Sequence, residues 1–175
     1  MSRRLGRPDY ARPATELAPA LLGKLLCRRL GGEVICARIT ETECYYGEQD
    51  SACHAHRGRT KRTATLYEPG GTAYVYLCYG IHEMLNVVSG PEGHPEAVLL
   101  RGVEGADGPG RLTKRLGVDR ALNGIDLAVS EELWIEDDGA VPEREASERV
   151  GIGYAEAEDR ARLWRWCVIG DAAKK

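Results

Sequence analysis

The chain is predicted to form one mixed α+β domain covering residues 1–175. Its length suits a single hydrophobic core, one segment has helical apolar spacing, and several short runs are rich in β-forming residues. No apolar run approaches the roughly 20 residues that span a bilayer, and the N-terminus lacks the apolar segment of a signal peptide. We therefore expect a soluble protein that is not secreted. It is expected in the cytoplasm or, in a eukaryote, in the nucleus.

The first elements lead from a helix to a strand and a long loop. Residues 15–30 carry leucines at helical spacing before two glycines, which predicts an amphipathic helix. Residues 34–42 are rich in β-branched side chains and predict a strand that ends near Glu43 and Tyr45. Residues 48–68 are polar and basic without a clear period, and a loop of this length is often functional.

A hairpin is expected next. Pro69, Gly70 and Gly71 break the chain before a strand at 72–79, and residues 84–88 predict a second strand. Tyr79 then lies at or close to the tip of the hairpin. Strand alternation places Tyr74 and Tyr76 on one face and Tyr79 on the other.

The remaining elements are shorter. Residues 97–101 predict a buried strand, whose terminal charge, Arg101, needs a carboxylate or phosphate partner. A short helix is expected at 111–116, followed by strands near 133–136 and 163–169.

The six cysteines form no C-x-x-C pair, and most are expected to be buried reduced thiols. Cys53, His54 and His56 are the one group that suggests a metal, but no second ligand pair with zinc spacing follows. We expect neither metal nor cofactor. A metal-dependent hydrolase that uses these three residues with Glu43 as its base stays open as an alternative.

The tyrosines and charges point to a planar, anionic partner. Of eight tyrosines, five fall at positions 45–46 and 74–79, in a chain with no phenylalanine. Tyrosine rings can stack on a nucleic-acid base. Although the net charge is −3, basic side chains gather at the N-terminus and at 57–62, and such an uneven distribution can present a basic face to a polyanion.

A family resemblance rests on several blocks taken together. They are residues 22–26, Glu41-Thr42-Glu43-Cys44-Tyr45 with His54, residues 69–80 with Asn86, and residues 98–101, 108–112 and 150–153. In this order they cover nearly the whole chain and resemble the alkyladenine DNA glycosylase family, also called the methylpurine or 3-methyladenine DNA glycosylases. The resemblance implies a curved, mainly antiparallel sheet with flanking helices and a protruding β-hairpin.

The same resemblance implies a base-excision-repair enzyme without metal or cofactor. Such an enzyme flips alkylated or deaminated purines out of double-stranded DNA and hydrolyses the N-glycosidic bond with a Glu-activated water, leaving an abasic site. No lysine stands at a matching catalytic position, so a monofunctional enzyme is expected. It is expected to act as a monomer, with no membrane partner. The preferred lesion stays open.

The resemblance also implies the roles of individual residues. Glu43 is the general base and Arg101 its partner, with Glu41 ranked second as base. Tyr45, His54 and Tyr76 line the base pocket, Asn86 crowds the exocyclic amine of guanine, and Tyr79 is the wedge that enters the duplex. Five residues are expected to contact the DNA backbone: Arg57, Arg59, Lys61, Arg111 and Lys114.

One alternative function involves no catalysis. A non-catalytic nucleic-acid binding module would use the same basic loop to hold DNA and would stack bases on the same tyrosines. Glu43 separates the two readings, because a pure binder loses little when Glu43 becomes Gln.

Overall fold

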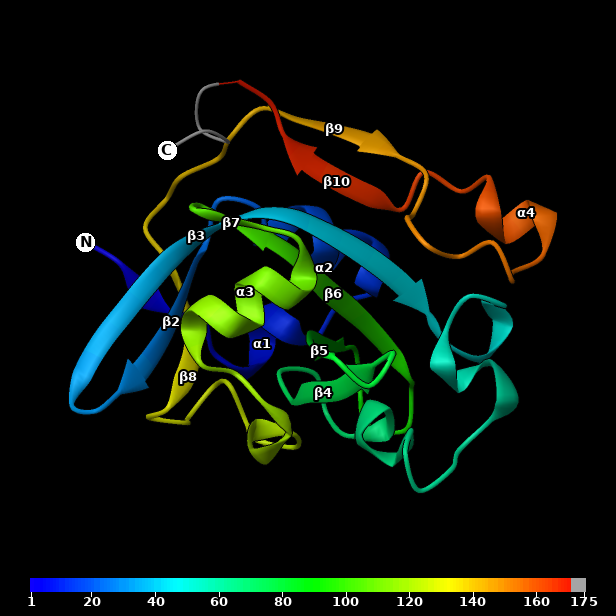
Figure 1. Ribbon diagram of the computed structural model, residues 1–175, viewed down its shortest axis with the longest axis horizontal. Helices are drawn as coiled ribbons and strands as arrows, with labels where there is room; N and C mark the ends of the chain where they lie inside the picture. The colour runs from blue at the N-terminus through cyan, green and yellow to red at the C-terminus, as the bar shows by residue number, and fades with distance from the viewer. Residues whose placement is uncertain (171–175) are drawn as a thin grey trace.

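The longest strand, β3 (Glu33–Tyr46), joins two halves of an antiparallel sheet. In this computed structural model, which describes residues 1–170, the first half of β3 pairs with β2 (Leu25–Leu30) and the second half with β6 (Glu96–Val103). Figure 1 shows β3 as the long arrow that crosses the molecule. The single strand β3 therefore belongs to both halves of the sheet.

The strand order places the predicted hairpin at one side of the sheet. The main path runs β1 (Arg3–Arg4), β8 (Leu133–Asp137), β2, β3, β6, β5 (His82–Ser89) and β4 (Ala73–Cys78). Off this path, β7 (Ala106–Asp107) pairs with β6, β10 (Arg165–Val168) with β3, and β9 (Arg144–Ser147) with β10. Every one of these strand pairs is antiparallel.

Helices are few and short. The described α-helices are α1 (Arg7–Tyr10), α2 (Ala14–Leu21), α3 (Pro109–Leu116) and α4 (Ala157–Arg160). Four 3-10 turns accompany them: η1 (Gly47–Gln49), η2 (His54–Arg57), η3 (Ala64–Tyr67) and η4 (Arg120–Leu122). A large antiparallel sheet with few helices agrees with the predicted mixed α+β class. None of the helices within residues 1–170 has both the length and the apolar character to cross a bilayer.

The main core lies on one face of the central strands. Cys44, Val98 and Val87 belong to the same buried cluster as Leu21 of α2 and Leu112 of α3. This cluster buries the apolar side chains of both helices, which supplies most of the driving force for folding. The opposite face of the same strands carries a separate set of side chains.

That opposite face is covered by the segment that follows β3. A smaller buried cluster joins residues of η2 and η3 to three strand residues: Ala55, Leu66, Tyr67, Tyr74, Val88 and Ala97, with Cys53. The expected loop at 48–68 is therefore ordered by three 3-10 turns, η1 to η3, of which η2 and η3 pack against the sheet.

The predicted helix at 15–30 is correct only in its first half. α2 ends at Leu21, and residues 25–30 form β2. Gly23 turns the chain with φ +82°, and its N–H donates to the Ile39 carbonyl over 2.9 Å. A Cβ at Gly23 would lie 2.5 Å from Cδ of Pro142, so no larger residue fits this turn.

The other predicted elements are found with small shifts. The segments 34–42, 72–79, 84–88 and 97–101 lie in β3, β4, β5 and β6, and the later ones in α3, β8 and β10. β1, β7, β9, α1 and α4 were not predicted, because two to four residues carry too little periodicity.

The expectation of mostly reduced cysteines needs one correction. Cys27 and Cys36 form a disulfide, because β2 and β3 place them directly opposite each other. Among the described residues, Cys44 and Cys53 are free and buried, and Cys78 and Cys167 are free and partly exposed.

Candidate active site

A row of four side chains crosses the face of the sheet opposite the main core. Glu43 of β3 pairs with Leu99 of β6, Leu99 with Asn86 of β5, and Asn86 with Tyr74 of β4. Directly paired residues in an antiparallel sheet point to the same face. The sheet register therefore brings together residues that are up to 56 positions apart in the sequence.

Strand alternation adds three more side chains to this face. Tyr45 lies two residues beyond Glu43, Arg101 two residues beyond Leu99, and Tyr76 two residues beyond Tyr74. Side chains two positions apart on a strand point the same way. The predicted faces of the strand at 72–79 are thus confirmed for Tyr74 and Tyr76.

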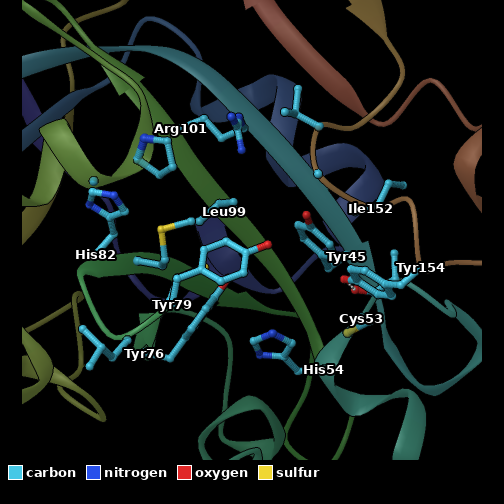
Figure 2. Close-up of a pocket in the computed structure, with 18 of the residues that line it drawn as sticks. Tyr45, Cys53, His54, Tyr76, Tyr79, His82, Leu99, Arg101, Ile152 and Tyr154 are labelled. Atoms are coloured by element: carbon cyan, nitrogen blue, oxygen red, sulfur yellow. Dashed lines mark hydrogen bonds between the residues drawn. The ribbon is translucent and has the colours of Figure 1, made fainter.

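Four of these seven side chains border a cavity of about 1110 Å³. Tyr45, His54, Tyr76, Tyr79 and Arg101 all line it. Figure 2 shows Tyr45 entering the cavity from one side and Tyr76 from another. A smaller recess of about 40 Å³ shares several of these walls and has Asn86 in its lining.

The Glu43 carboxylate is fully buried and held by three groups. Its side chain is 0 % exposed. Oε2 accepts the Val150 N–H over 2.6 Å, Oε1 accepts the Tyr45 hydroxyl over 3.1 Å, and Arg101 Nη1 lies 3.5 Å from Oε1. Burial raises the pKa of Glu43 above 4.5, and the charge of Arg101 and the two hydrogen bonds oppose that rise.

The carboxylate stands behind the cavity wall. Tyr45, Arg101 and Val150 line the cavity and are also the groups that contact Glu43. A water molecule that reaches Glu43 must pass between them. A charge buried in this way is costly unless it is compensated, and its retention favours a functional role.

Glu41, the second candidate for the base, is engaged differently. Its Oε1 accepts Arg101 Nε over 3.0 Å and Arg165 Nε over 2.6 Å. The predicted carboxylate partner of Arg101 is confirmed, and Glu41 makes the shorter contact. Two guanidinium groups thus contact the same Glu41 oxygen, so this carboxylate is engaged in ion pairs with both arginines.

The aromatic side of the cavity is a packed group of rings. The ring centroids of His54 and Tyr76 are 4.5 Å apart, and those of Tyr74 and Tyr76 are 5.4 Å apart. His54 Nδ1 lies 3.0 Å from the Tyr74 hydroxyl oxygen. Burial and the nearby Arg62 lower the pKa of His54 to about 4, so its ring is neutral at pH 7. The tyrosines also stay neutral, since burial raises the pKa of Tyr74 to about 12.

Asn86 lines the small recess and is 4 % exposed. Its Nδ2 donates to the Tyr74 carbonyl over 3.2 Å. This bond fixes the side chain against β4. The structure therefore gives Asn86 both a backbone partner and a place in the wall of the recess.

Tyr79 lies in the turn between β4 and β5. It was predicted on the face opposite Tyr76, but it lines the same cavity, because it lies beyond the end of β4, where strand alternation no longer applies. It is 87 % exposed, and its φ of 51° is the one positive value among the non-glycine residues that the structure describes. Ile81, in the same turn, is 74 % exposed. Ile81 was not predicted as a functional residue, although an apolar residue beside Gly80 in the expected hairpin turn was a visible signal.

The predicted DNA-backbone residues are all exposed, but they are not all at the cavity. Arg57 and Arg111 line it, whereas Arg59, Lys61 and Lys114 lie outside its lining. Arg62, which was not selected, also lines the cavity, with its guanidinium carbon 5.4 Å from the centroid of the Tyr76 ring.

Most of the cavity residues near the C-terminus were not predicted from the sequence. Val150, Ile152 and Tyr154 line the cavity, and Arg149 is buried behind Tyr45. The one visible signal was the glycine-containing turn at 151–154. Nothing in its spacing shows that it packs against residues a hundred positions earlier.

The Cys53, His54 and His56 group does not converge. His56 Nδ1 bonds with the Glu48 carbonyl over 2.8 Å, while His54 faces Tyr74. Within residues 1–170, no group of three or more His, Cys, Asp or Glu side chains is arranged to hold a metal ion.

Comparison with known proteins gives one consistent result. The model of a protein family described as "Methylpurine-DNA glycosylase (MPG)" matches residues 8–107 and 103–172. A protein of Psychrobacter cryohalolentis is 44% identical over 95% of this chain and 93% of its own length. One of Methanocella arvoryzae is 42% identical over 93% and 90%, and one of Anaeromyxobacter dehalogenans is 46% identical over 95% and 83%. All three are provisionally named 3-methyladenine DNA glycosylases.

Proposed function

Because this chain belongs to the methylpurine-DNA glycosylase family, we propose that it removes alkylated or deaminated purines from double-stranded DNA in base-excision repair. The reaction is hydrolysis of the N-glycosidic bond, and its DNA product is an abasic site. The relatives' names favour 3-methyladenine among the lesions.

The observation that carries the proposal is a fully buried carboxylate behind the wall of an aromatic cavity. Glu43 has no exposed surface, yet Tyr45, Arg101 and Val150 connect it to a space of about 1110 Å³. A module that only binds nucleic acid gains nothing from burying this charge. A hydrolase needs a base that is shielded from bulk water but close to the bond it breaks.

Access to the bond requires the damaged nucleotide to leave the duplex. Rotating a base out of the stack costs a few kcal/mol, and least at a damaged pair. Tyr79 is exposed in the β4–β5 turn beside Ile81, and we assign it to the gap that the flipped base leaves. This assignment gives the two exposed apolar side chains of the turn a common purpose.

The flipped purine would lie against Tyr45, His54 and Tyr76 at the cavity wall. Alkylation at a ring nitrogen gives many of these purines a positive charge, which tyrosine faces attract more than a neutral base. Neutral His54 adds a ring without adding a competing cation. Asn86, fixed by its bond to the Tyr74 carbonyl, would crowd the exocyclic amine of guanine.

The chemical step then uses Glu43. A water molecule attacks the sugar C1′ while the bond from C1′ to the purine nitrogen breaks, and Glu43 takes the proton of that water. The leaving purine keeps the bonding electron pair. Positive charge develops on the sugar ring, and the ionised carboxylate stabilises it.

Strand cleavage at abasic sites tests this function. The protein is incubated, with EDTA present, with duplex DNA that carries one hypoxanthine or one alkylated adenine, and abasic sites are then cleaved by alkali. We expect lesion-dependent breaks with the wild type and none with Glu43→Gln. Tight binding to every lesion without any cleavage by the wild type would instead support a non-catalytic binding module.

A further inference from the structure

Arg149 is a second enclosed charge near the site, besides Glu43. Its side chain is 0 % exposed, and its two terminal nitrogens donate to both carboxylate oxygens of Asp50 over 2.6 and 2.9 Å. The same nitrogens donate to the carbonyls of Cys44, over 3.0 Å, and Asp159, over 3.2 Å. Burying an ion pair is expensive, and a pair with this many fixed partners holds its surroundings in one geometry.

The first link from Arg149 to Glu43 is through the backbone. Val150, the next residue, donates its N–H to Glu43 Oε2 over 2.6 Å. Arg149 ties this part of the C-terminal segment to the end of β3 through the Cys44 carbonyl. The position of the Val150 N–H therefore depends on where the guanidinium is anchored.

The second link is through Tyr45. The guanidinium carbon of Arg149 lies 5.0 Å from the centroid of the Tyr45 ring, and the Tyr45 hydroxyl donates to Glu43 Oε1 over 3.1 Å. A cation over a ring face at this distance is attractive and restricts the ring. Arg149 thus supports both neutral donors to the carboxylate, one on each oxygen.

The anchor itself is fixed on the other side. Asp50 also accepts the backbone N–H of Tyr46 over 2.9 Å and that of Ala52 over 3.1 Å. These bonds fasten it to the segment that follows β3 and leads to His54. The Arg149–Asp50 pair thereby connects three parts of the chain at one buried point: the C-terminal segment, the end of β3 and the segment that follows β3.

We propose that Arg149 is a positioning residue for base excision: it holds the Val150 N–H and the Tyr45 hydroxyl on Glu43 and so fixes the carboxylate toward the attacking water. This inference rests on the proposed function. Arg149 is assigned no contact with the substrate, because it does not line the cavity, whereas Tyr45, over whose ring it lies, does.

Several charged and polar groups besides Arg149 surround Glu43, and they determine how the carboxylate responds when Arg149 is weakened. The Glu43 carboxylate is contacted directly by Arg101 of β6. Ion pairs link Arg101 to Glu41 of β3, and Glu41 to Arg165 of β10. Neutral hydroxyls near the carboxylate come from Tyr45 and Tyr154. No described hydrogen bond or ion pair joins Arg149 to the charges of Arg101, Arg165 or Glu41, so these charges should keep their positions when only the guanidinium anchor is weakened. Loss of the two donors then leaves the buried carboxylate less stabilised as an anion.

The test compares Arg149→Lys with Arg28→Lys. Lysine keeps the positive charge but lacks the two terminal nitrogens that bind both oxygens of Asp50. Arg28 is a matched control, since it is 8 % exposed, donates to the Glu132 carbonyl over 3.0 Å and does not line the cavity. For Arg149→Lys we expect a single-turnover excision rate about 10- to 100-fold lower with unchanged affinity for lesion DNA, and for Arg28→Lys a rate near that of the wild type.

Two further readouts separate positioning from stability alone. The acid limb of the single-turnover rate should move to higher pH in Arg149→Lys, and the carboxyl ¹³C titration of Glu43, assigned by difference from Glu43→Gln, should move the same way. Both variants are compared at equal distances below their Tm. Equal rates for the two Lys variants, or an unmoved Glu43 titration in Arg149→Lys, would overturn the inference.

Asp50→Asn replaces Arg149→Lys if that variant does not fold, because it keeps the shape of the anchor while removing its charge. The same rate loss and titration shift are expected. If the wild type excises no lesion, the proposed function fails, whereas the Glu43 titration still decides whether Arg149 holds the carboxylate.

Discussion

Arg101 Nη1 lies 3.5 Å from Glu43 Oε1, while its Nε donates to Glu41 over 3.0 Å. One guanidinium therefore serves two carboxylates two residues apart on β3. Glu41 has a second guanidinium partner, Arg165, over 2.6 Å, but Glu43 has neutral donors on both of its oxygens. The two acids differ in environment, and the proposal of Glu43 as the base rests on that difference.

Glu43→Gln should abolish measurable excision, because general-base catalysis contributes about 10²- to 10⁴-fold. Glu41→Gln should keep excision and lose less than about tenfold in single-turnover rate. Affinity for lesion DNA should be similar in both variants and the wild type. Equal losses in the two variants would remove the assignment of Glu43 as the base.

The pH dependence should follow the titration of Glu43. The base works ionised, so the rate should fall as the pH drops through its pKa, which burial raises above 4.5. The acid limb of the single-turnover rate should therefore have its midpoint above that value. His54 has a pKa of about 4, so His54→Gln should lower the rate without moving the limb. If the acid limb of the rate moves in His54→Gln, the group whose titration it reports is His54 and not Glu43.

The same shift has a consequence for stability, with a defined sign. A carboxyl whose pKa is raised by folding costs stability once it ionises, so the cost grows as pH rises from 4.5 through the folded pKa. Tm of Glu43→Gln relative to the wild type should therefore increase with pH over this window and be constant below it. Thermal unfolding in a buffer series checks this, with Glu41→Gln as the control.

Tyr79→Ser should impair excision from duplex DNA far more than from single-stranded DNA, because only the duplex leaves a gap to fill. Tyr79 is 87 % exposed, so the free energy of unfolding should change by no more than about 0.5 kcal/mol. Ile81→Ser, at 74 % exposure, tests whether the second apolar side chain shares the task. Equal losses on both substrates would assign Tyr79 to the pocket instead.

Much of the candidate site was predictable because its residues lie where strands end or turn. Glu43 and Tyr45 follow a β-branched run, and Tyr76 and Tyr79 bracket the end of a strand before glycine. These signals are local, so periodicity is enough to find them. The resemblance to a family then gave each residue a role that strand patterns alone do not supply.

What was missed depends on contacts between distant segments. Arg149 and Asp50 are 99 residues apart, and neither has a pattern that marks a partner. The helix was extended too far for a related reason. Leu25 and Leu26 fit helical spacing, but Gly23 turns the chain and the pairing of β2 with β3 and β8 decides the structure. Tertiary pairing outweighs helix propensity here.

Asn86→Ser should widen the range of lesions. Asn86 is 4 % exposed and is held by its bond to the Tyr74 carbonyl, so its side chain cannot swing away from a bulky purine. Serine removes this bulk, and the rate for 7-methylguanine relative to hypoxanthine should rise about 10-fold or more, since pocket contacts of this size discriminate by about 1–3 kcal/mol. An unchanged ratio would show that Asn86 serves the strand only.

The exposed basic side chains of the 57–62 segment should set the salt dependence of binding. Each phosphate contact contributes about 0.9 to the slope of log affinity against log salt. Arg59→Gln and Lys61→Gln should each reduce the slope by about that amount and weaken binding to lesion and undamaged duplex alike. Single-turnover rates at saturating enzyme should not change.

Arg29→Gln is the matched control for these two variants. Arg29 is exposed on β2, beside Trp134 and outside the lining of the cavity. Its loss should leave the salt slope unchanged, because a charge away from the DNA releases no counterions. A slope that falls equally in Arg29→Gln and Arg59→Gln would mean that binding depends on the overall charge of the protein, and that the segment at 57–62 is not the backbone contact.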